Sequence, residues 1–269
     1  FFINLILQLI VQSKKMCGIS GIISLNGKPI NNLEEKIKLM TNLLHHRGPD
    51  QQGFFTNDNK NFALSNNRLS IVAPEEKIEL PYTKDKKNYL SFNGEIYNFL
   101  SIKSSLVEKG CKFNSSTDTE VLYEFLKYYD NKKFNELNGM WSFAFYDNEK
   151  NNLILSRDLL GERQLYYYTD EKQLIFSSEV EPILHVNEKI NEIEPSSVMS
   201  SWKYNSSGTR KTLIKNIFRM RPGTNLICSN GKIKFEQFQK INLEKWLNYF
   251  ENSPPLPQVQ KKFEELFSD

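Results

Sequence analysis

The stretch Met16-Cys17-Gly18-Ile19-Ser20-Gly21 is the most informative part of this chain. A cysteine directly follows a methionine, so cleavage after that methionine would make Cys17 the first residue of the processed protein. A thiol with an ordinary pKa of about 8.5 and an α-amino group with a pKa of about 8 would then belong to one residue. The amine could accept the thiol proton without a histidine, which makes Cys17 a candidate nucleophile that carries its own base.

Residues 1–15 stand before Met16, and the sequence begins with Phe1. Their apolar run is shorter than the ~20 residues that span a bilayer. It also lacks the basic start and the small-residue cleavage site of a secretory signal. We therefore expect residues 1–16 to be a leader or a removable extension rather than a native structural helix, and we expect no membrane partner. If the extension stays attached, the Cys17 nitrogen is an amide and cannot act as a base.

Length and charge exclude one broad class of function. A chain of 269 residues with 39% hydrophobic residues is long enough for one large domain or two modest ones. The net charge is only +3, from 35 basic and 32 acidic residues that are scattered along the chain. Nucleic-acid binding is therefore not expected, because it requires basic residues concentrated on one surface.

The cysteines and histidines indicate neither a disulfide framework nor a metal site. The three cysteines are Cys17, Cys111 and Cys228, and the three histidines are His45, His46 and His185. An odd number of widely separated cysteines favours reduced thiols and a cytoplasmic protein. The two adjacent histidines would point about 100° apart on a helix and do not form the i, i+4 pair of a helical zinc site. We predict no metal.

Periodicity predicts strands in groups, with helices between them. The apolar run 18–25 stops at Asn26-Gly27, which is typical of a hairpin turn. Apolar residues then recur at helical spacing over 33–44, after a capping-box-like Asn32…Glu35. The other expected strands are 61–64, 68–72, 89–92, 140–146, 153–156, 164–168 and 173–176, and the other expected helices are 96–109, 119–129 and 259–267. This grouping favours an α+β sandwich over a doubly wound parallel sheet.

A series of short sequence words follows in a fixed order. They are MCGISGI (16–22), HRGPD (46–50), NRLSIV (67–72), FNGEIYN (92–98), TDTE (117–120), LNGMWSFAFYD (137–147), SRDLLGERQLYY (156–167) and FSSEVEPIL (176–184). In these words the chain resembles the N-terminal glutaminase domain of glutamine-dependent asparagine synthetases, class II amidotransferases of the N-terminal-nucleophile (Ntn) hydrolase group. The resemblance covers about residues 16–240 and implies a four-layer αββα sandwich of antiparallel sheets. Amidotransferases that act on sugar phosphates or phosphoribosyl donors differ at the RGPD and RLSI words.

The resemblance implies a chemistry that the residues can perform. Cys17 would attack the side-chain amide of L-glutamine, giving a glutamyl thioester and ammonia before water releases glutamate. By resemblance, the Asn93 side-chain amide and the Gly94 backbone N–H form the oxyanion hole, where losing one donor costs about 3–4 kcal/mol of barrier. Glycine also suits a place where a side chain would obstruct the substrate.

The remaining predicted residues would hold the substrate's α-carbon groups. The planar guanidinium of Arg68 fits a carboxylate in a bidentate pair. Glu95 and Asp118 match the acidic residues of the family that bind the α-ammonium group. Together these charges would select a free amino acid over a peptide. Weaker candidates are the RLSIV residues Leu69, Ile71 and Val72, whose backbone lines the pocket in the family.

Each residue also has a structural interpretation. Cys17 could be a small buried thiol, Arg68 a surface charge, and Asn93-Gly94 only a turn. Asp118 could be the N-cap of the helix that follows, alone or in addition to a binding role. The aromatic runs 141–146 and 166–168 are expected to be core strands rather than a cofactor site. Arg47 and Asp50 of HRGPD are expected to order the loop after the first helix rather than to bind substrate.

One word departs from the family pattern. Where the family has a DRxGxKPLYY-like sequence, Leu159 replaces a basic or small residue and Arg163-Gln164 replaces Lys-Pro. By analogy this segment lies outside the glutamine pocket, so the departure bears on contacts with a synthetase domain.

The chain is expected to contain one catalytic domain at 17–240, followed at 241–269 by a linker and the start of a missing synthetase domain. The glutaminase reaction requires no cofactor, and no ATP-binding phosphate loop is present. ATP and Mg²⁺ are expected only with the missing domain, which would make asparagine from aspartate and ammonia. Two alternatives remain: a different acceptor, such as a peptide or saccharide, or a non-catalytic module in which the retained leader blocks Cys17. A homodimer is also possible.

Overall fold

The computed structural model describes residues 16–70, 78–129, 132–187, 189–190, 192–204, 210–240, 247 and 255–267. The chain divides into two compact units, Phe1–Gln239 and Lys240–Asp269. The second unit contains helix α8 (Leu256–Phe267), and the first contains the remaining helices and strands. Among the described residues, no helix combines the length and the apolar character that crossing a membrane requires.

The first unit is built on two antiparallel β-sheets. The strands of one sheet are β1 (Gly18–Ser24), β2 (Gln51–Thr56), β3 (Phe62–Arg68), β7 (Tyr166–Thr169), β8 (Gln173–Ser177) and β9 (Ile217–Arg219), in the order β2-β3-β1-β8-β7-β9. The strands of the other are β4 (Asn88–Ile96), β5 (Gly139–Asp147), β6 (Asn152–Arg157), β10 (Thr224–Ser229) and β11 (Lys232–Gln237), in the order β11-β10-β6-β5-β4. Each pair of neighbours is antiparallel.

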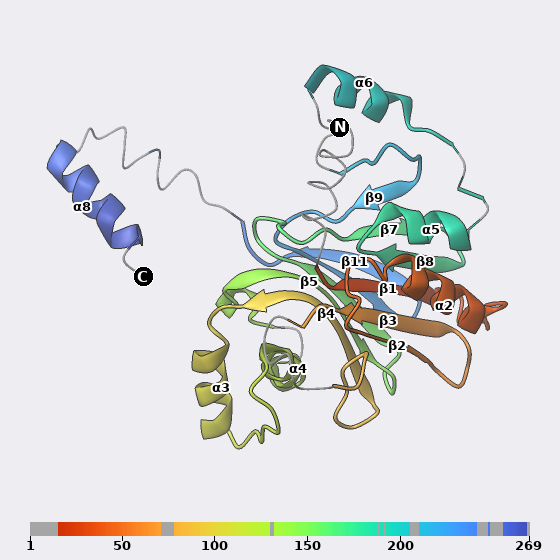
Figure 1. Cartoon of the computed structure of the whole chain (residues 1–269), viewed down its shortest axis with the longest axis horizontal. Helices are drawn as coiled ribbons and strands as arrows, with labels where there is room; N and C mark the ends of the chain where they lie inside the picture. The colour runs from red at the N-terminus through yellow and green to blue at the C-terminus, as the bar shows by residue number, and fades with distance from the viewer. Residues whose placement is uncertain are drawn as a thin grey trace. The chain divides into compact units, whose positions relative to one another are not determined.

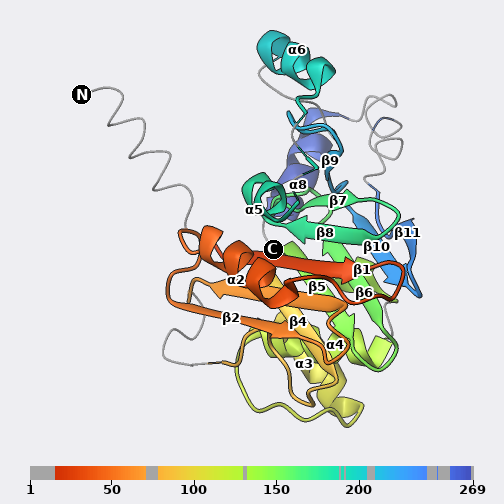
Figure 2. The ribbon, with the colours of Figure 1, turned by 90° about the vertical axis from the view of Figure 1, so that its right-hand side faces the viewer.

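Helices cover the outer faces of both sheets (Figures 1 and 2). Helices α2 (Leu33–Leu43) and α5 (Val180–Val186) pack on the six-stranded sheet. Helices α3 (Phe99–Glu108) and α4 (Asp118–Tyr129) pack together beside the five-stranded sheet. Three buried hydrophobic clusters fill the three boundaries between these layers. The four-layer αββα sandwich predicted from the resemblance is confirmed. The unit also contains α6 (Pro195–Tyr204) and a short 3₁₀ helix, η1 (Phe134–Glu136).

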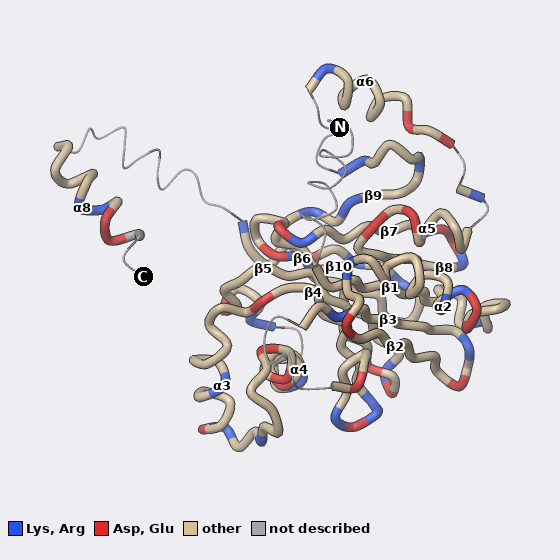
Figure 3. Tube along the Cα trace, in the orientation of Figure 1, with Lys and Arg blue, Asp and Glu red and all other residues tan. Residues whose placement is uncertain are grey.

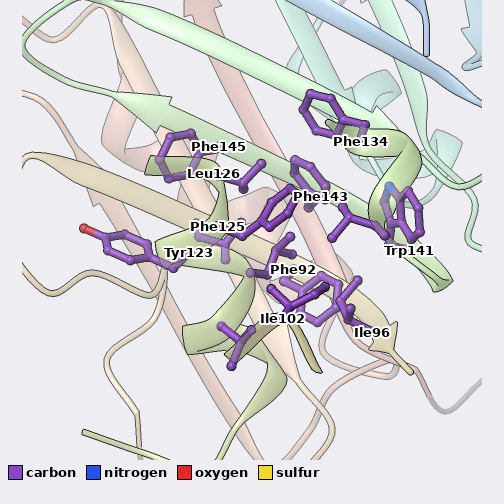
Figure 4. Close-up of a cluster of buried hydrophobic side chains, with 14 of the residues drawn as sticks. Phe92, Ile96, Ile102, Tyr123, Phe125, Leu126, Phe134, Trp141, Phe143 and Phe145 are labelled. Carbon is purple, nitrogen blue, oxygen red and sulfur yellow. The ribbon is translucent and has the colours of Figure 1, made fainter. Parts of the chain in front are cut away.

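Side chains alternate between the two faces of β5, so this one strand contributes to two hydrophobic clusters. Trp141, Phe143 and Phe145 belong to the cluster under α3 and α4 (Figure 4). Ala144 and Tyr146 belong instead to the cluster between the sheets. Successive side chains of a strand point to opposite faces, so one aromatic run supplies two cores. The prediction that this run is a core strand is confirmed.

Two local predictions were wrong. Asn26-Gly27 does not form a hairpin, because β1 pairs with β3 and β8 and the chain continues into α2. The Asn26 carboxamide instead accepts hydrogen bonds from the Ser24 hydroxyl and the Lys28 N–H. Asn32 makes no side-chain cap on α2, because its backbone is left-handed, with φ 53°.

Several element boundaries also differ from the prediction. Strand β3 extends the expected strand 61–64 as far as Arg68, where the expected strand 68–72 was to begin, and residues 71 and 72 lie outside the described residues. The expected helix 96–109 begins later, because β4 continues to Ile96. Strand β3 tolerates Asn66 and Asn67, poor strand formers, because the side-chain NH₂ group of each donates hydrogen bonds. Asn66 donates to the Gly18 carbonyl at 3.1 Å, and Asn67 donates to the Thr41 carbonyl at 3.0 Å. Strands β2, β9, β10 and β11 and helices α5 and α6 were not predicted.

Candidate active site

Strand alternation brings Cys17 and Arg68 to the layer between the two sheets. Ile19 of β1 and Leu64 of β3 lie in the inter-sheet cluster. Cys17 stands two residues before Ile19, and Arg68 stands four residues after Leu64, so both share the parity of these core residues. Gly18 pairs with Asn67 in the register of the two strands, which places the cysteine beside the end of β3.

The same argument places two residues of β4. Tyr89 belongs to the inter-sheet cluster, and Asn93 and Glu95 follow at even spacing on the same face. The β4 backbone is tied to β3 across the sandwich, because Phe92 N–H donates to the Asn66 carboxamide oxygen at 3.2 Å. The end of the inter-sheet layer is therefore polar, although its middle is hydrophobic.

A cleft opens at this end of the layer. Its lining residues are Met16, Cys17, Asn66, Arg68, Leu69, Ile78, Leu80, Phe92, Asn93, Gly94, Glu95, Thr117, Asp118, Thr119 and Arg163. The structure thus brings together seven of the nine residues that the sequence singled out. The other two, Ile71 and Val72, lie outside the described residues.

The Cys17 thiol is held by the backbone of Leu69. The Leu69 N–H donates to Sγ at 3.3 Å, and Sγ lies 3.7 Å from the Leu69 carbonyl oxygen, to which the thiol donates. Burial raises the pKa of the Cys17 thiol, although the Leu69 N–H and three arginines act in the opposite direction. These arginines are Arg68, Arg47 and Arg163. The thiol is therefore oriented but protonated at neutral pH, and its reaction requires a base.

Arg47 holds the backbone of Cys17 through a hydrogen bond to its carbonyl oxygen. Its Nε donates to the Cys17 carbonyl oxygen at 3.1 Å, and its Nη1 pairs with Glu179 at 2.9 Å. Burial opposes ionisation of Glu179, but hydrogen bonds from Arg47 and His46 hold the pKa of this carboxyl below its usual range. In the same loop, the Asp50 carboxylate accepts the Ser70 N–H at 2.8 Å. These contacts of Arg47 and Asp50 are all with the chain itself, as the structural interpretation of HRGPD predicts.

Asn93-Gly94 lies in the middle of β4, so its interpretation as a turn was wrong. Asn93 is buried, and its Nδ2 lies 3.4 Å from the Ser142 hydroxyl, a weak bond that leaves one amide hydrogen for another acceptor. A Cβ at Gly94 would overlap with the Met140 carbonyl oxygen and lie 2.7 Å from the Trp141 Cα. Glycine is required here by the close approach of β5, a reason that the sequence did not indicate.

Two carboxylates share one side of the cleft. Asp118 is the first residue of α4, and its Oδ2 accepts the Ile96 N–H at 3.1 Å. Burial raises the pKa of the Asp118 carboxyl, and the charge of Glu95 raises it further, while hydrogen bonds from backbone N–H groups oppose the shift. A bound cation would relieve this repulsion. With Arg68 lining the same cleft, the site has partners for both the carboxylate and the ammonium group of an amino acid.

The segment that contains Arg163 was expected to lie outside the pocket, and for Arg163 this prediction was wrong, because the residue lines the cleft. Its guanidinium contacts the Met16 Sδ, and among the described residues its buried Nε has no hydrogen-bond partner. The backbone is fixed on both sides: Asp158 accepts the Arg163 N–H at 3.1 Å, and Arg157 donates to its carbonyl at 2.8 Å. The only sequence signal was that it occupies the lysine position of the family word.

The described residues contain no cluster of three or more His, Cys, Asp or Glu side chains that could hold a metal ion. The polar groups of the cleft are instead a thiol, backbone N–H groups, guanidinium groups and two carboxylates. This set suits acyl transfer from an amino-acid substrate.

The four layers, with a cysteine at the start of a central strand, define the Ntn-hydrolase class of fold. A solved structure of glutamine phosphoribosylpyrophosphate amidotransferase from Bacillus subtilis has the same fold, with a TM-score of 0.59. The alignment covers 84% of this chain and 50% of that chain, at 18% identity. At this identity the likeness concerns the fold alone.

The chain belongs to the glutamine amidotransferase domain family, which it matches over residues 16–239. It is 31% identical over 233 residues to asparagine synthetase [glutamine-hydrolyzing] 1 of Bacillus subtilis, covering 85% of this chain and 36% of that protein. It is 32% identical over 187 residues to asparagine synthetase B [glutamine-hydrolyzing] of Escherichia coli, covering 69% and 33%. The predicted resemblance is confirmed, and the chain spans about a third of the length of these relatives.

Proposed function

We propose that this domain hydrolyses L-glutamine to glutamate and ammonia, with Cys17 as the nucleophile. The observation that carries the proposal is the cleft itself, in which a thiol lies among an arginine, two carboxylates and a buried carboxamide. In this proposal Arg68 binds the α-carboxylate of glutamine, and Glu95 and Asp118 bind its α-ammonium group. The side-chain amide of the substrate then extends toward Cys17.

Each step of the proposed reaction uses groups of this cleft. The Cys17 thiolate attacks the amide carbon, and the carbonyl oxygen becomes an oxyanion that accepts hydrogen bonds from the Asn93 side chain and the Gly94 N–H. The Cys17 amine, protonated by the thiol, returns that proton to the departing ammonia. Water activated by the same amine then cleaves the thioester, which releases glutamate and restores the thiol.

This mechanism requires removal of residues 1–16, because an amide nitrogen at Cys17 cannot act as a base. Met16 lines the cleft and contacts Arg163, so its removal would also open space beside the nucleophile. We propose that the active form begins at Cys17 and that residues 17–240 form the glutaminase domain.

The complete protein, in this proposal, is an asparagine synthetase. Residues 241–269 would lead into a synthetase domain that uses ATP and Mg²⁺ to join ammonia to aspartate. The support is the identity to relatives that carry this name and are about three times as long as the matched segment. Three free cysteines at wide spacing support a cytoplasmic location. A different acceptor remains the second candidate, because a segment outside this chain would choose it.

Intact mass spectrometry with a glutamine-analogue diazo-ketone tests the proposal. A chain that begins at Cys17 should gain one adduct and release ammonia from glutamine, and Cys17→Ala should lose both. Cys111→Ala is the matched control, because Cys111 lies outside the cleft, and it should retain both. A Cys17→Ala chain that hydrolyses glutamine at the unsubstituted rate would refute the proposal. A processed chain without adduct or ammonia would support the non-catalytic alternative.

A further inference from the structure

A second cavity lies where an edge strand of one sheet meets an edge strand of the other. It has a volume of about 530 Å³ and is lined by Tyr167, Arg210, Arg219, Arg221, Pro222, Thr224, Phe235 and Gln237. Strand β9 ends the six-stranded sheet and β11 ends the five-stranded sheet. None of these lining residues belongs to the cleft around Cys17. The volume lies within the range of about 300–1,000 Å³ that is typical of small-molecule sites.

All the charged residues that line this cavity are positively charged. Three of its eight lining residues are arginines, and none is acidic. Among the described residues, no ion pair links Arg210 or Arg221 to a carboxylate. In Figure 3 basic segments of the tube lie at β9. The charge of Arg219 also affects a neighbouring arginine. Burial lowers the pKa of Arg157, and the nearby positive charge of Arg219 lowers it further, although the carboxylate of Asp158 opposes the shift. Gathering cations in this way costs free energy, which a bound anion would recover.

Aromatic rings hold two of the arginines in place. The Arg210 guanidinium lies 5.1 Å from the centroid of Phe218, and its Nη2 donates to the Tyr167 hydroxyl at 3.3 Å. The Arg219 guanidinium lies 5.7 Å from the ring of Tyr166. The backbone links the two arginines, because the Arg219 N–H donates to the Arg210 carbonyl at 2.7 Å. Stacked guanidinium groups are already held in place, so they lose less side-chain entropy when they bind an oxyanion.

The cavity also has an apolar wall. Phe235 of β11 is 47% exposed, and its ring lies 5.8 Å from that of the buried Tyr167. An exposed aromatic ring beside guanidinium groups can contact the ring or apolar part of a ligand whose anionic end meets the arginines. Thr224 and Gln237, which are directly paired on β10 and β11, add neutral hydrogen-bonding groups at the same place.

We propose that this cavity binds a small phosphorylated ligand, with its phosphate on Arg210, Arg219 and Arg221 and an apolar or aromatic part against Phe235. Phosphate is favoured because it carries up to two charges and enough oxygens for several guanidinium groups at once. The site is independent of the glutaminase proposal, since it shares no residue with the cleft. An acidic protein segment is the competing occupant, and the experiment must distinguish it.

The test is titration of the 269-residue chain, followed by NMR, with phenyl phosphate, inorganic phosphate, phenol and a glutamate-rich peptide. We expect phenyl phosphate to bind more tightly than inorganic phosphate, phenol to bind undetectably, and amide shifts to concentrate at Tyr167 and Phe235. The double variant Arg210→Gln/Arg221→Gln should weaken phenyl phosphate by about tenfold or more, as loss of charge-assisted hydrogen bonds implies. Both arginines are exposed, so this variant should keep its unfolding temperature.

The matched control is Lys232→Gln/Lys234→Gln on β11, which removes the same charge outside the cavity. It should change phenyl phosphate binding by less than about twofold, because these two charges do not line the cavity and exposed charges are screened by salt. An equal loss in both double variants would overturn the proposal in favour of general charge attraction. Tighter, arginine-dependent binding of the peptide would overturn it in favour of an acidic partner. Absence of phenyl phosphate binding to the unsubstituted chain would also overturn it.

Discussion

Replacing Arg47 with methionine removes the side chain that links the nucleophile's backbone to Glu179. The Arg47 side chain is 6% exposed and that of Glu179 is 23% exposed, so this ion pair is largely withdrawn from water. A hydrogen bond between charged groups contributes about 1.5–3 kcal/mol, and one to a neutral carbonyl contributes about 1 kcal/mol. The bond to a neutral carbonyl is the one from Arg47 Nε to the Cys17 carbonyl oxygen, at 3.1 Å. We therefore expect Arg47→Met to lower the free energy of unfolding by about 3 kcal/mol.

Urea and thermal unfolding of the chain measure this loss. For a domain of this size, 3 kcal/mol corresponds to a fall in Tm of about 6–12 °C. A double-mutant cycle with Glu179→Gln separates the ion pair from the Cys17 contact, and its coupling energy should be about 1.5–2 kcal/mol. A coupling below about 0.5 kcal/mol would show that the pair behaves like an exposed salt bridge and would refute the reasoning.

The pH dependence gives an independent check on the same pair. The pKa of Glu179 is lowered in the folded state, against an unfolded value of about 4.3. The folded state therefore gains stability above that unfolded value, and the gain is lost as pH falls through the lower folded pKa. The unsubstituted chain should lose more stability than Glu179→Gln between about pH 5 and pH 3. Identical acid profiles would contradict the depressed pKa.

Three further predictions concern the cleft. Gly94→Ala should lower the free energy of unfolding by about 1–3 kcal/mol, because its Cβ overlaps with β5; unchanged urea unfolding would contradict this. In the chain that keeps Met16, iodoacetamide should alkylate Cys17 with a pH midpoint above the ordinary thiol value of about 8.5, because burial raises the pKa of this thiol. Mass mapping that gives a midpoint below that of free cysteine would exclude a raised pKa for Cys17. In the processed chain, Asp118→Asn should raise the KM for glutamine by about tenfold, with a smaller effect on kcat. The exposed control Asp58→Asn should leave the KM unchanged. An unchanged KM in Asp118→Asn would show that Asp118 does not bind the substrate.

The residues that gather in the cleft were predictable where each lies in a contiguous word. Cys17, Arg68 and Asn93 stand beside neighbours that identify them, so their sequence context carries the information. Arg163 stands 147 residues from Met16, the residue that it contacts, and no local pattern reports such a distance. The requirement for glycine at position 94 is equally non-local, because it comes from the path of the neighbouring strand β5.

The same dipeptide gave opposite outcomes at two places in the chain. Asn230-Gly231 joins β10 to β11, and both residues have positive φ, 49° and 74°, as a type I′ hairpin turn requires. Asn26-Gly27 joins a strand to a helix instead. The difference was present in the sequence: 232–236 alternates between polar and apolar side chains, whereas Pro29 soon follows Gly27. A turn signal predicts a hairpin only where the next residues can pair with the strand before it.

The period of two residues along a strand also explains why the site forms at the end of the sandwich. Side chains that share the parity of the inter-sheet core must face the other sheet, and near the middle of the layer they must be apolar. Beyond the last core residue the same parity still directs Cys17 and Arg68 inward from one sheet and Asn93 and Glu95 inward from the other. Polar groups on these four positions therefore converge without any loop having to carry them. The hydrophobic layer that stabilises the fold thus orients Cys17, the proposed nucleophile, toward the polar groups proposed to bind the substrate.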